Sequence, residues 1–401
     1  MSIAAVPDYL GKDFATASPG MRFGYYLSIW NSDWSKETDI PKDTWKSMTR
    51  LNKGDKKHAE SLVLRQRRVA TSFGDTIFSV DAVAISPFTT GLGNEHPLEN
   101  GFAFLSPYGL PYLPGSGVKG VVRQAALELA SGDWGDTGGW SEDRITALFG
   151  PKGADGDSEH QRGALSFWDV IPLIKDDALQ VEIMTPHQGH YYQQKKDRKT
   201  GGSVSPHDSG QPNPISFLTV PPGSGFAFHV LCDLELLGHT KSELIEGGRW
   251  KQLLVAAFEH AFAWCGFGAK TAVGYGAMGE DQQRKAERQR EEMARQEALR
   301  VQREKEARER EIEQMDPIDR EIARFLDARA DKNQPEINAL VSGLTSNAWS
   351  GEQAVAIAGK VKIRMQAEKQ WKEKSEKKNP DKDRDYQRTK TVMGYLKKPE
   401  A

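Results

Sequence analysis

Short apolar runs, separated by glycine, proline and polar turn residues, occupy the chain up to Gly279. The segment Thr76–Ile85 alternates apolar and polar residues in its first half, a period of two that predicts a strand. Further strands and two helices follow from the same pattern. The strands are predicted at Ala164–Ile174, Val181–Met184, Ile215–Val220 and Phe226–Leu237, and the helices at Val118–Ala130 and Trp250–Trp264. This order is compatible with an α+β, ferredoxin-like split β-α-β sheet that carries long insertions.

The pattern changes at Asp281, where aromatic residues, glycine and proline disappear until about Gln314. Between Asp281 and Glu313 there are ten acidic and ten basic residues, spaced so that opposite charges fall three or four positions apart. Good helix formers with such pairs predict one long solvated helix. The apolar residues of this helix are Met293, Leu299, Val301 and Ile312. They do not follow a seven-residue repeat, so a coiled coil is only the alternative.

Helical patterning returns after Asp316, in a second and smaller unit. Helices are predicted at Ile318–Ala328, Pro335–Leu344 and Gly351–Trp371. The core residues expected for them are few, which favours docking or marginal stability; they are Ile322, Phe325, Leu326, Ile337, Leu340, Val341, Ala354 and Ile357. From Lys360 to Lys398 there are fourteen basic and six acidic residues, so this stretch either touches phosphates or is a solvated tail. The predicted domains are residues 1–279, 280–315 and 316–401.

Composition narrows the class of protein. The formal net charge of -2 argues against a global positive field, so any nucleic-acid contact has to be local. Two cysteines, Cys232 and Cys265, exclude a disulfide scaffold and a four-cysteine zinc site, and fit a reducing compartment. The first residues lack the basic region followed by an apolar run that is typical of a secretory signal peptide. No stretch approaches the roughly eighteen apolar residues of a membrane span. We therefore expect a soluble cytoplasmic protein with no membrane partner.

The segment Gly115-Ser116-Gly117-Val118-Lys119-Gly120 matches the G-x-G-x-x-G pattern, which brings backbone N–H groups at a helix start against phosphate. A dinucleotide site also needs a preceding strand and a later acidic residue. Here prolines break the preceding segment, and the later acids fall in a Gly- and Trp-containing loop, so that class is disfavoured. Lys119 and Arg123 are four residues apart and share a helix face, as suits a polyanion. A purely structural turn and cap is the alternative.

A second glycine-rich segment runs from Gly266 to Gly276. It contains Gly268-Ala269-Lys270-Thr271, but a nucleotide-binding P-loop needs glycine before the lysine and a strand before the loop, so ATP binding is disfavoured. Its glycines permit close backbone approach, Lys270 supplies a cation and Tyr275 a ring for stacking. These are the ingredients for holding RNA by phosphate and base face.

Together the two segments, Pro-Gly-Ser-x-x-Lys-Gly-x-x-Arg from Pro114 and Gly-x-Gly-Ala-Lys-Thr-x-x-Gly-Tyr-Gly from Gly266, resemble the RAMP superfamily of CRISPR-associated proteins. The residues between them are similar to the subunit family that caps the 3′ end of crRNA in type III-B Cmr complexes. The likeness covers roughly residues 15–279 and leaves residues 280–401 outside it. Between the two glycine-rich segments, the residues that carry the likeness are Met184-Thr185-Pro186-His187, Tyr191-Tyr192, Asp208 and Pro212–Val220.

The resemblance implies a modified RNA-recognition-motif domain that is assembled on a guide RNA beside other Cmr subunits in antiviral defence. Its expected partners are crRNA, target RNA and those subunits, and it implies no catalysis, small-molecule cofactor or metal. The residues expected to bind RNA are Gly115, Ser116, Gly117, Lys119, Gly120, Arg123, His187, Tyr191, Tyr192, Lys195, Lys196, Gly266, Gly268, Lys270, Thr271, Gly274 and Tyr275.

Two other functions stay open. Some members of the superfamily cleave RNA, and His187, His190, His207 and Asp208, near the lysine-rich segment Lys195–Lys199, offer groups for metal-independent acid–base cleavage. The pair His187-x-x-His190 lacks a third ligand at usable spacing for a metal. Alternatively, the C-terminal extension is a protein-only assembly bridge.

Overall fold

The computed structural model describes residues 2–37, 40, 42–151, 162–185, 214–375 and 377–397. Contacts within the chain divide it into two units, Met1–Arg288 and Gln289–Ala401. The division falls inside one helix, α9 (Gln282–Gln314). Each unit has its own hydrophobic core. None of the described helices combines the length and apolar character that crossing a membrane requires.

A four-stranded sheet forms the centre of the first unit. Its strands are β3 (Ile77–Ala84), β6 (Leu165–Phe167), β9 (Gly225–Cys232) and β10 (Met278–Glu280). Their order across the sheet is β10-β3-β9-β6, and every neighbouring pair is antiparallel. When these four strands are numbered in chain order, their order across the sheet is therefore fourth, first, third, second.

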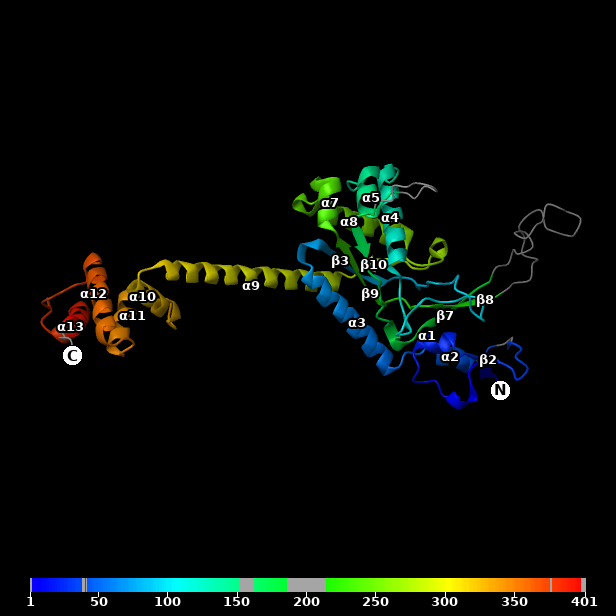
Figure 1. The fold of residues 1–401 in the computed structure, drawn as a ribbon, viewed down its shortest axis with the longest axis horizontal. Coiled ribbons are helices and arrows are strands. Elements are labelled where there is room, and N and C mark those ends of the chain that lie inside the picture. The colour runs from blue at the N-terminus through cyan, green and yellow to red at the C-terminus, as the bar shows by residue number, and fades with distance from the viewer. Residues whose placement is uncertain are drawn as a thin grey trace, which may run out of the picture. The chain divides into compact units, whose positions relative to one another are not determined.

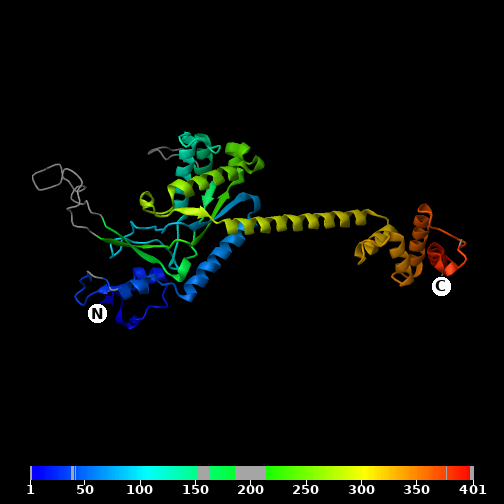
Figure 2. The ribbon, with the colours of Figure 1, turned by 180° about the vertical axis from the view of Figure 1, so that it is seen from behind.

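Helices cover both faces of this sheet. Two helices, α4 (Gly115–Ser131) and α8 (Arg249–His260), lie on one face, where Phe226, Phe228 and Val230 of β9 pack against them (Figure 1). A long helix, α3 (Lys53–Ser72), lies on the other face (Figure 2). Alternate residues of β9 thus enter different layers, as the period of a strand requires.

The layer between the sheet and α3 is partly polar. Asp81 of β3 accepts a hydrogen bond from Arg67 of α3 at 2.6 Å and lies 3.6 Å from Arg288. On the neighbouring strand, His229 Nδ1 lies 2.8 Å from the Ser79 hydroxyl. Burial, together with the nearby Arg67 and Arg288, lowers the pKa of His229 to about 4. The ring is therefore neutral in the folded protein at pH 7.

The remaining elements of the first unit are short. An antiparallel hairpin, β7 (Gln180–Met184) with β8 (Ile215–Thr219), lies outside the main sheet. The other described elements are β1 (Ile3–Ala4), α1 (Pro19–Gly24), β2 (Ser28–Trp30), α2 (Lys42–Thr49), β4 (Phe104–Leu105), β5 (Leu110–Pro111), α5 (Glu142–Phe149) and α7 (Leu234–Lys241).

Two predicted strands are too long. The strand expected at Ala164–Ile174 is regular only over β6, and beyond it isolated bridges replace the ladder. The strand expected at Phe226–Leu237 ends at Cys232, because the Asp233 side chain accepts a hydrogen bond from the Leu236 N–H and caps α7. The predictions for β3, β7 and β8 are confirmed within one residue at each end.

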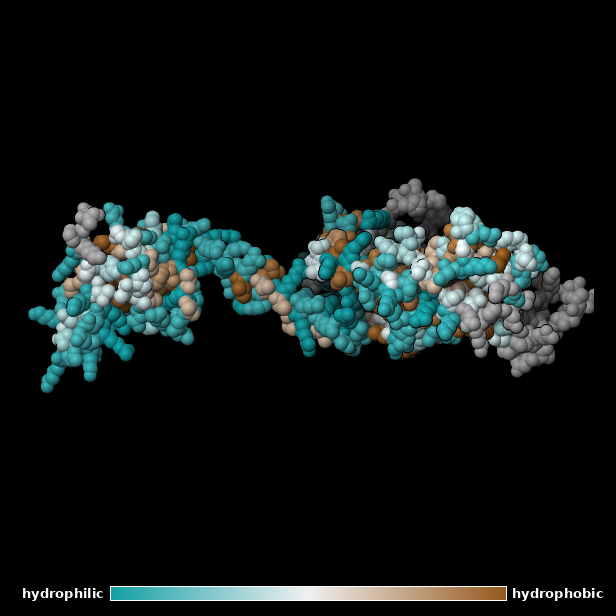
Figure 3. All heavy atoms as spheres, turned by 90° about the horizontal axis from the view of Figure 1, so that it is seen from below, coloured by the Kyte–Doolittle hydropathy of each residue, from teal (hydrophilic) through white to brown (hydrophobic). Residues whose placement is uncertain are grey.

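The predicted long charged helix is found as α9, and Ile312 is its one buried residue among those described. Ion pairs three or four residues apart line its surface, including Arg300 with Glu297 at 2.6 Å and with Glu304 at 3.0 Å. Its other apolar side chains, such as Met293 and Val301, are exposed. In Figure 3, which colours each residue by its hydropathy, hydrophilic residues cover much of the protein surface and hydrophobic residues are exposed among them.

Four helices build the second unit around its own core: α10 (Pro317–Ala328), α11 (Glu336–Thr345), α12 (Gly351–Ala367) and α13 (Arg384–Leu396). The predicted core residues are all in this cluster, with Phe325 partly buried at its edge. The reading of the stretch after Lys360 as a solvated tail is wrong for α13, whose Val392 is fully buried in the core. Asp383 caps this helix by accepting a hydrogen bond from the Tyr386 N–H.

Candidate nucleic-acid interface

The first glycine-rich segment forms the start of α4. The Gly115 N–H donates to Asp169 Oδ1 at 2.7 Å, and the N–H groups of Gly117 and Val118 donate to the Pro114 carbonyl at 2.9 and 3.1 Å. A side chain at position 115 would overlap the Phe167 carbonyl. The protein itself therefore uses the Gly115, Gly117 and Val118 amides of the segment that the sequence assigned to phosphate. What this segment offers a polyanion is the side chains of the exposed helix face.

Three cations gather on that face. Lys119 and Arg123 lie one turn apart on α4 and are half-buried, and Arg162 approaches from the segment that leads into β6. Burial, and then the charges of Arg123 and Arg162, lowers the pKa of Lys119. In the part of the chain that the structure describes, none of the three forms an ion pair with a carboxylate. Among the described residues, positive charge is therefore concentrated at this cluster.

Arg162 is a member of this cluster that sequence reasoning missed. Its guanidinium donates to the Ser166 hydroxyl at 3.0 Å, which fixes it beside β6. It lies 39 positions beyond Arg123, so helical spacing gives no hint of the approach. The packing of α4 against β6 brings the two segments together.

The second glycine-rich segment closes on the protein backbone. The Phe267 N–H donates to the Gly276 carbonyl, the Gly276 N–H to Pro87 and the Ala269 N–H to Thr89, all at 2.8 to 2.9 Å. Gly268 and Gly276 have φ of +89° and +71°, and a side chain at either position would overlap backbone atoms. The close backbone approach expected to serve RNA serves the fold at these positions. Gly274, with φ of +95°, faces open space.

Two side chains of this segment that were predicted to bind RNA, those of Lys270 and Tyr275, contact the β7–β8 hairpin. Lys270 Nζ lies 3.4 Å from Met184 Sδ and 5.3 Å from the centre of the Phe217 ring. The Tyr275 ring packs edge-on against Phe217 at 5.5 Å, and its hydroxyl donates to Glu182 at 3.5 Å. Burial and the Glu182 charge raise the pKa of Tyr275. Lys270 and Thr271 are half-buried, so their polar atoms are reachable from solvent.

The remaining predicted residues lie outside the described part of the chain. They are His187, Tyr191, Tyr192, Lys195 and Lys196, together with the alternative catalytic candidates His190, His207 and Asp208.

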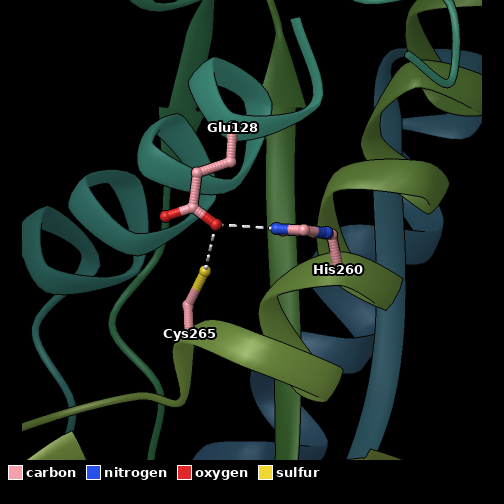
Figure 4. A group of neighbouring side chains, drawn as sticks. All are labelled: Glu128, His260 and Cys265. Atoms are coloured by element: carbon pink, nitrogen blue, oxygen red, sulfur yellow. Dashed lines mark hydrogen bonds and ion pairs between the residues drawn. The ribbon is translucent and has the colours of Figure 1, made fainter. Parts of the chain in front are cut away.

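A group of three potential metal ligands, which the sequence did not suggest, lies at the other end of α4. Glu128, His260 and Cys265 point toward one another from α4 and from the end of α8 (Figure 4). Their ligand atoms all lie within 4.8 Å of one another. More than 130 residues separate Glu128 from the other two, so only the packing of α4 on α8 reveals the group.

Comparison with known proteins supports the resemblance that the motifs at Pro114 and Gly266 indicated. Residues 81–278, which include most of the sheet, α4, α8 and both glycine-rich segments, match the model of the RAMP superfamily.

A curated relative is also similar to this chain. It is the CRISPR system Cmr subunit Cmr6 of Pyrococcus furiosus, 27% identical over 242 residues. The match covers 49% of this chain and 65% of the relative, so somewhat less than two thirds of that protein's length is represented.

Solved structures of CRISPR proteins are also similar. A chain of the type III-B Cmr-beta complex bound to cognate target RNA is 20% identical, with a TM-score of 0.41 over 60% of this chain and 71% of that one. The crystal structure of Cmr6 from Pyrococcus furiosus is 26% identical, with a TM-score of 0.28 over 51% of this chain and 98% of that one.

Proposed function

We propose that this chain is a non-catalytic RNA-binding subunit of a type III-B CRISPR effector ribonucleoprotein. It contacts crRNA near its 3′ end and contributes to recognition of target RNA in cytoplasmic antiviral defence, beside other Cmr subunits. The match of residues 81–278 to the RAMP superfamily and the similarity to Cmr6 support the assignment to such a complex. The position on the guide rests on the resemblance of the motifs between Met184 and Val220.

We infer that the sheet is ferredoxin-like, of the RNA-recognition-motif type. The strand order of fourth, first, third and second, with all neighbours antiparallel and a helix after the first and third strands, supports this topology. In this chain helices cover both faces of the sheet. RNA contact is therefore assigned to helix and loop side chains rather than to the sheet surface.

The observation that carries the proposal is the cluster of Lys119, Arg123 and Arg162. Burial, and then the charges of Arg123 and Arg162, lowers the pKa of Lys119, so among its described neighbours the positive charge is costly unless an anion joins the cluster. An RNA backbone supplies such anions at regular spacing, and arginine binds phosphate oxygens in a two-pronged manner. Because these contacts go to phosphate, they hold the RNA without reading its sequence.

The test is RNA binding by the double variant Lys119→Ala, Arg123→Ala in the assembled complex. Loss of two charge-assisted contacts weakens crRNA retention by at least about tenfold. The slope of log affinity against log salt concentration becomes shallower by about 1.4, at roughly 0.7 per phosphate contact on a single strand. Arg300→Ala with Arg308→Ala is the matched control, because both arginines are exposed on α9 and paired with acidic residues. Unchanged retention and slope in the Lys119, Arg123 variant would refute the phosphate role.

The two alternatives have separate readouts. An endonuclease requires cleavage of RNA by the isolated chain that disappears with His187→Ala or Asp208→Ala. A protein-only bridge requires that removal of the second unit abolish assembly while RNA binding by the first unit persists. Truncation after Arg288, rather than after Gly279, keeps the contact of Arg288 with Asp81 and the Ser79 carbonyl.

A further inference from the structure

Glu128, His260 and Cys265 form a compact group of three different donor types. Glu128 Oε2 lies 2.7 Å from His260 Nε2 and 3.8 Å from Cys265 Sγ. In a tetrahedral zinc site with bonds of about 2.0 to 2.3 Å, neighbouring donor atoms are about 3.3 to 3.7 Å apart. The Glu128–Cys265 distance is close to this range, the Glu128–His260 pair has to open by roughly half an ångström, and all three atoms lie within 4.8 Å of one another.

The surrounding elements hold the three side chains in place. Glu128 lies in the last turns of α4, His260 ends α8, and Cys265 closes the π-helical turn Ala261–Cys265 that follows it. Extra-wide helical turns of this kind occur frequently at functional sites. The other carboxylate oxygen of Glu128 accepts a hydrogen bond from Gln124 at 3.0 Å, which leaves Oε2 as the ligand atom.

Burial differs across the group. His260 is 7% exposed, and Trp134 packs edge-on against its ring at 4.9 Å. Glu128 and Cys265 are half-buried, so the open side of the group is reached by solvent. Water can therefore supply the fourth ligand from the open side. The Trp134 ring covers the His260 imidazole and shields it from bulk solvent.

We propose that Glu128, His260 and Cys265 bind a zinc-class divalent cation, with water completing the coordination. Thiolate and imidazole donors select zinc over magnesium and calcium, which take oxygen ligands. The site joins α4 to the end of α8 immediately before the second glycine-rich segment, so the ion cross-links the two helices that cover the sheet. This departs from the sequence-based expectation of no metal.

The test uses the untagged full chain, depleted of metal and titrated with Co²⁺, whose thiolate charge-transfer absorption reports sulfur ligation. We expect one equivalent to produce this band and Zn²⁺ to displace it. Cys265→Ser abolishes the band, whereas the matched control Cys232→Ser keeps it, because Cys232 is buried elsewhere in the core. Glu128→Gln keeps the sulfur and the band but weakens affinity at least about tenfold.

Stability provides a second readout that does not depend on the band. Zn²⁺ raises the thermal midpoint of the unsubstituted chain and of Cys232→Ser, but not that of Cys265→Ser. Absence of a thiolate band in the unsubstituted chain overturns the proposal, as does a band that persists in Cys265→Ser. Circular dichroism of Glu128→Gln shows that a weakened site is not simply an unfolded protein.

Discussion

The neutral imidazole of His229 makes the stability of the first unit depend on pH. The ring is buried between the sheet and α3, with Nδ1 at the Ser79 hydroxyl and no partner for Nε2 among the described residues. Its pKa is lowered from 6.5 to about 4, chiefly by burial. In the unfolded chain the ring takes up a proton as the pH falls below 6.5, whereas in the fold it does so only near pH 4. Stability is therefore full above pH 6.5 and is lost as the pH falls from 6.5 to 4.

The size of this loss follows from the shift. The pKa of His229 is about 2.5 lower in the fold than in the unfolded chain, and at about 1.36 kcal/mol for each pH unit this gives a total loss of about 3 kcal/mol in the free energy of unfolding. About 2 kcal/mol of it is lost between pH 7.5 and pH 5. The perturbation that isolates this contribution is His229→Asn, whose amide reaches the Ser79 hydroxyl without a titrating ring.

The assay is amide hydrogen exchange of peptides from β3 and β9, measured from pH 5 to 7.5 after correction for intrinsic exchange rates. It reports opening of the first unit separately from the second. Between pH 7.5 and 5, the opening free energy of the unsubstituted protein drops by about 2 kcal/mol more than that of His229→Asn. His239→Asn serves as the control, because that side chain is exposed and hydrated in both states. Parallel pH profiles for the unsubstituted protein and His229→Asn would show that the buried ring is not the cause.

Two further substitutions test the packing of each unit. Gly276→Ala places a methyl group against the Phe267 carbonyl at a φ of +71° and lowers stability by about 2 kcal/mol or more, whereas Gly274→Ala, strained but in open space, costs about 1 kcal/mol. Thermal denaturation of the two variants measures the difference, and equal midpoints would contradict the overlap. Ile357→Ala empties a fully buried site and destabilises the second unit by about 2 to 5 kcal/mol, whereas Ile363→Ala, 62% exposed, has almost no effect. Urea unfolding followed by hydrogen exchange of α12 peptides distinguishes these outcomes, and similar losses for both isoleucines would contradict the assigned core.

Hydrophobic patterning predicted the elements whose apolar residues are dense. α4 and α8 were found within a few residues of their ends, because each has a broad apolar face. α3 was missed, because it buries few side chains, among them Ala59, Val63 and Ala70, in twenty residues. Its capping box, Asn52 with Asp55, was the signal present in the sequence. α13 was missed for the same reason. Val392 is its one buried aliphatic residue, and the charged residues around it leave no apolar pattern in the sequence.

The candidate site divides in the same way. Helical spacing alone paired Lys119 with Arg123, since residues four apart share a face. Arg162 joins them through the packing of β6 on α4, and Glu128 joins His260 through the packing of α4 on α8, contacts that no local pattern contains. Gly115, Gly268 and Gly276 were recognised correctly as positions of close approach, but the approaching group at each is the protein's own backbone, whereas Gly120 and Gly274 face open space.

The lengths of the strands limit how this protein can meet its neighbours. The central strands β3 and β9 have eight residues each, whereas the edge strands β6 and β10 have three each. So short an edge exposes few unpaired N–H and C=O groups, and it gives another chain little to extend as a continuous sheet. A protein that docks at these edges must therefore be held through side chains, and its fit can be altered one residue at a time without disturbing the sheet.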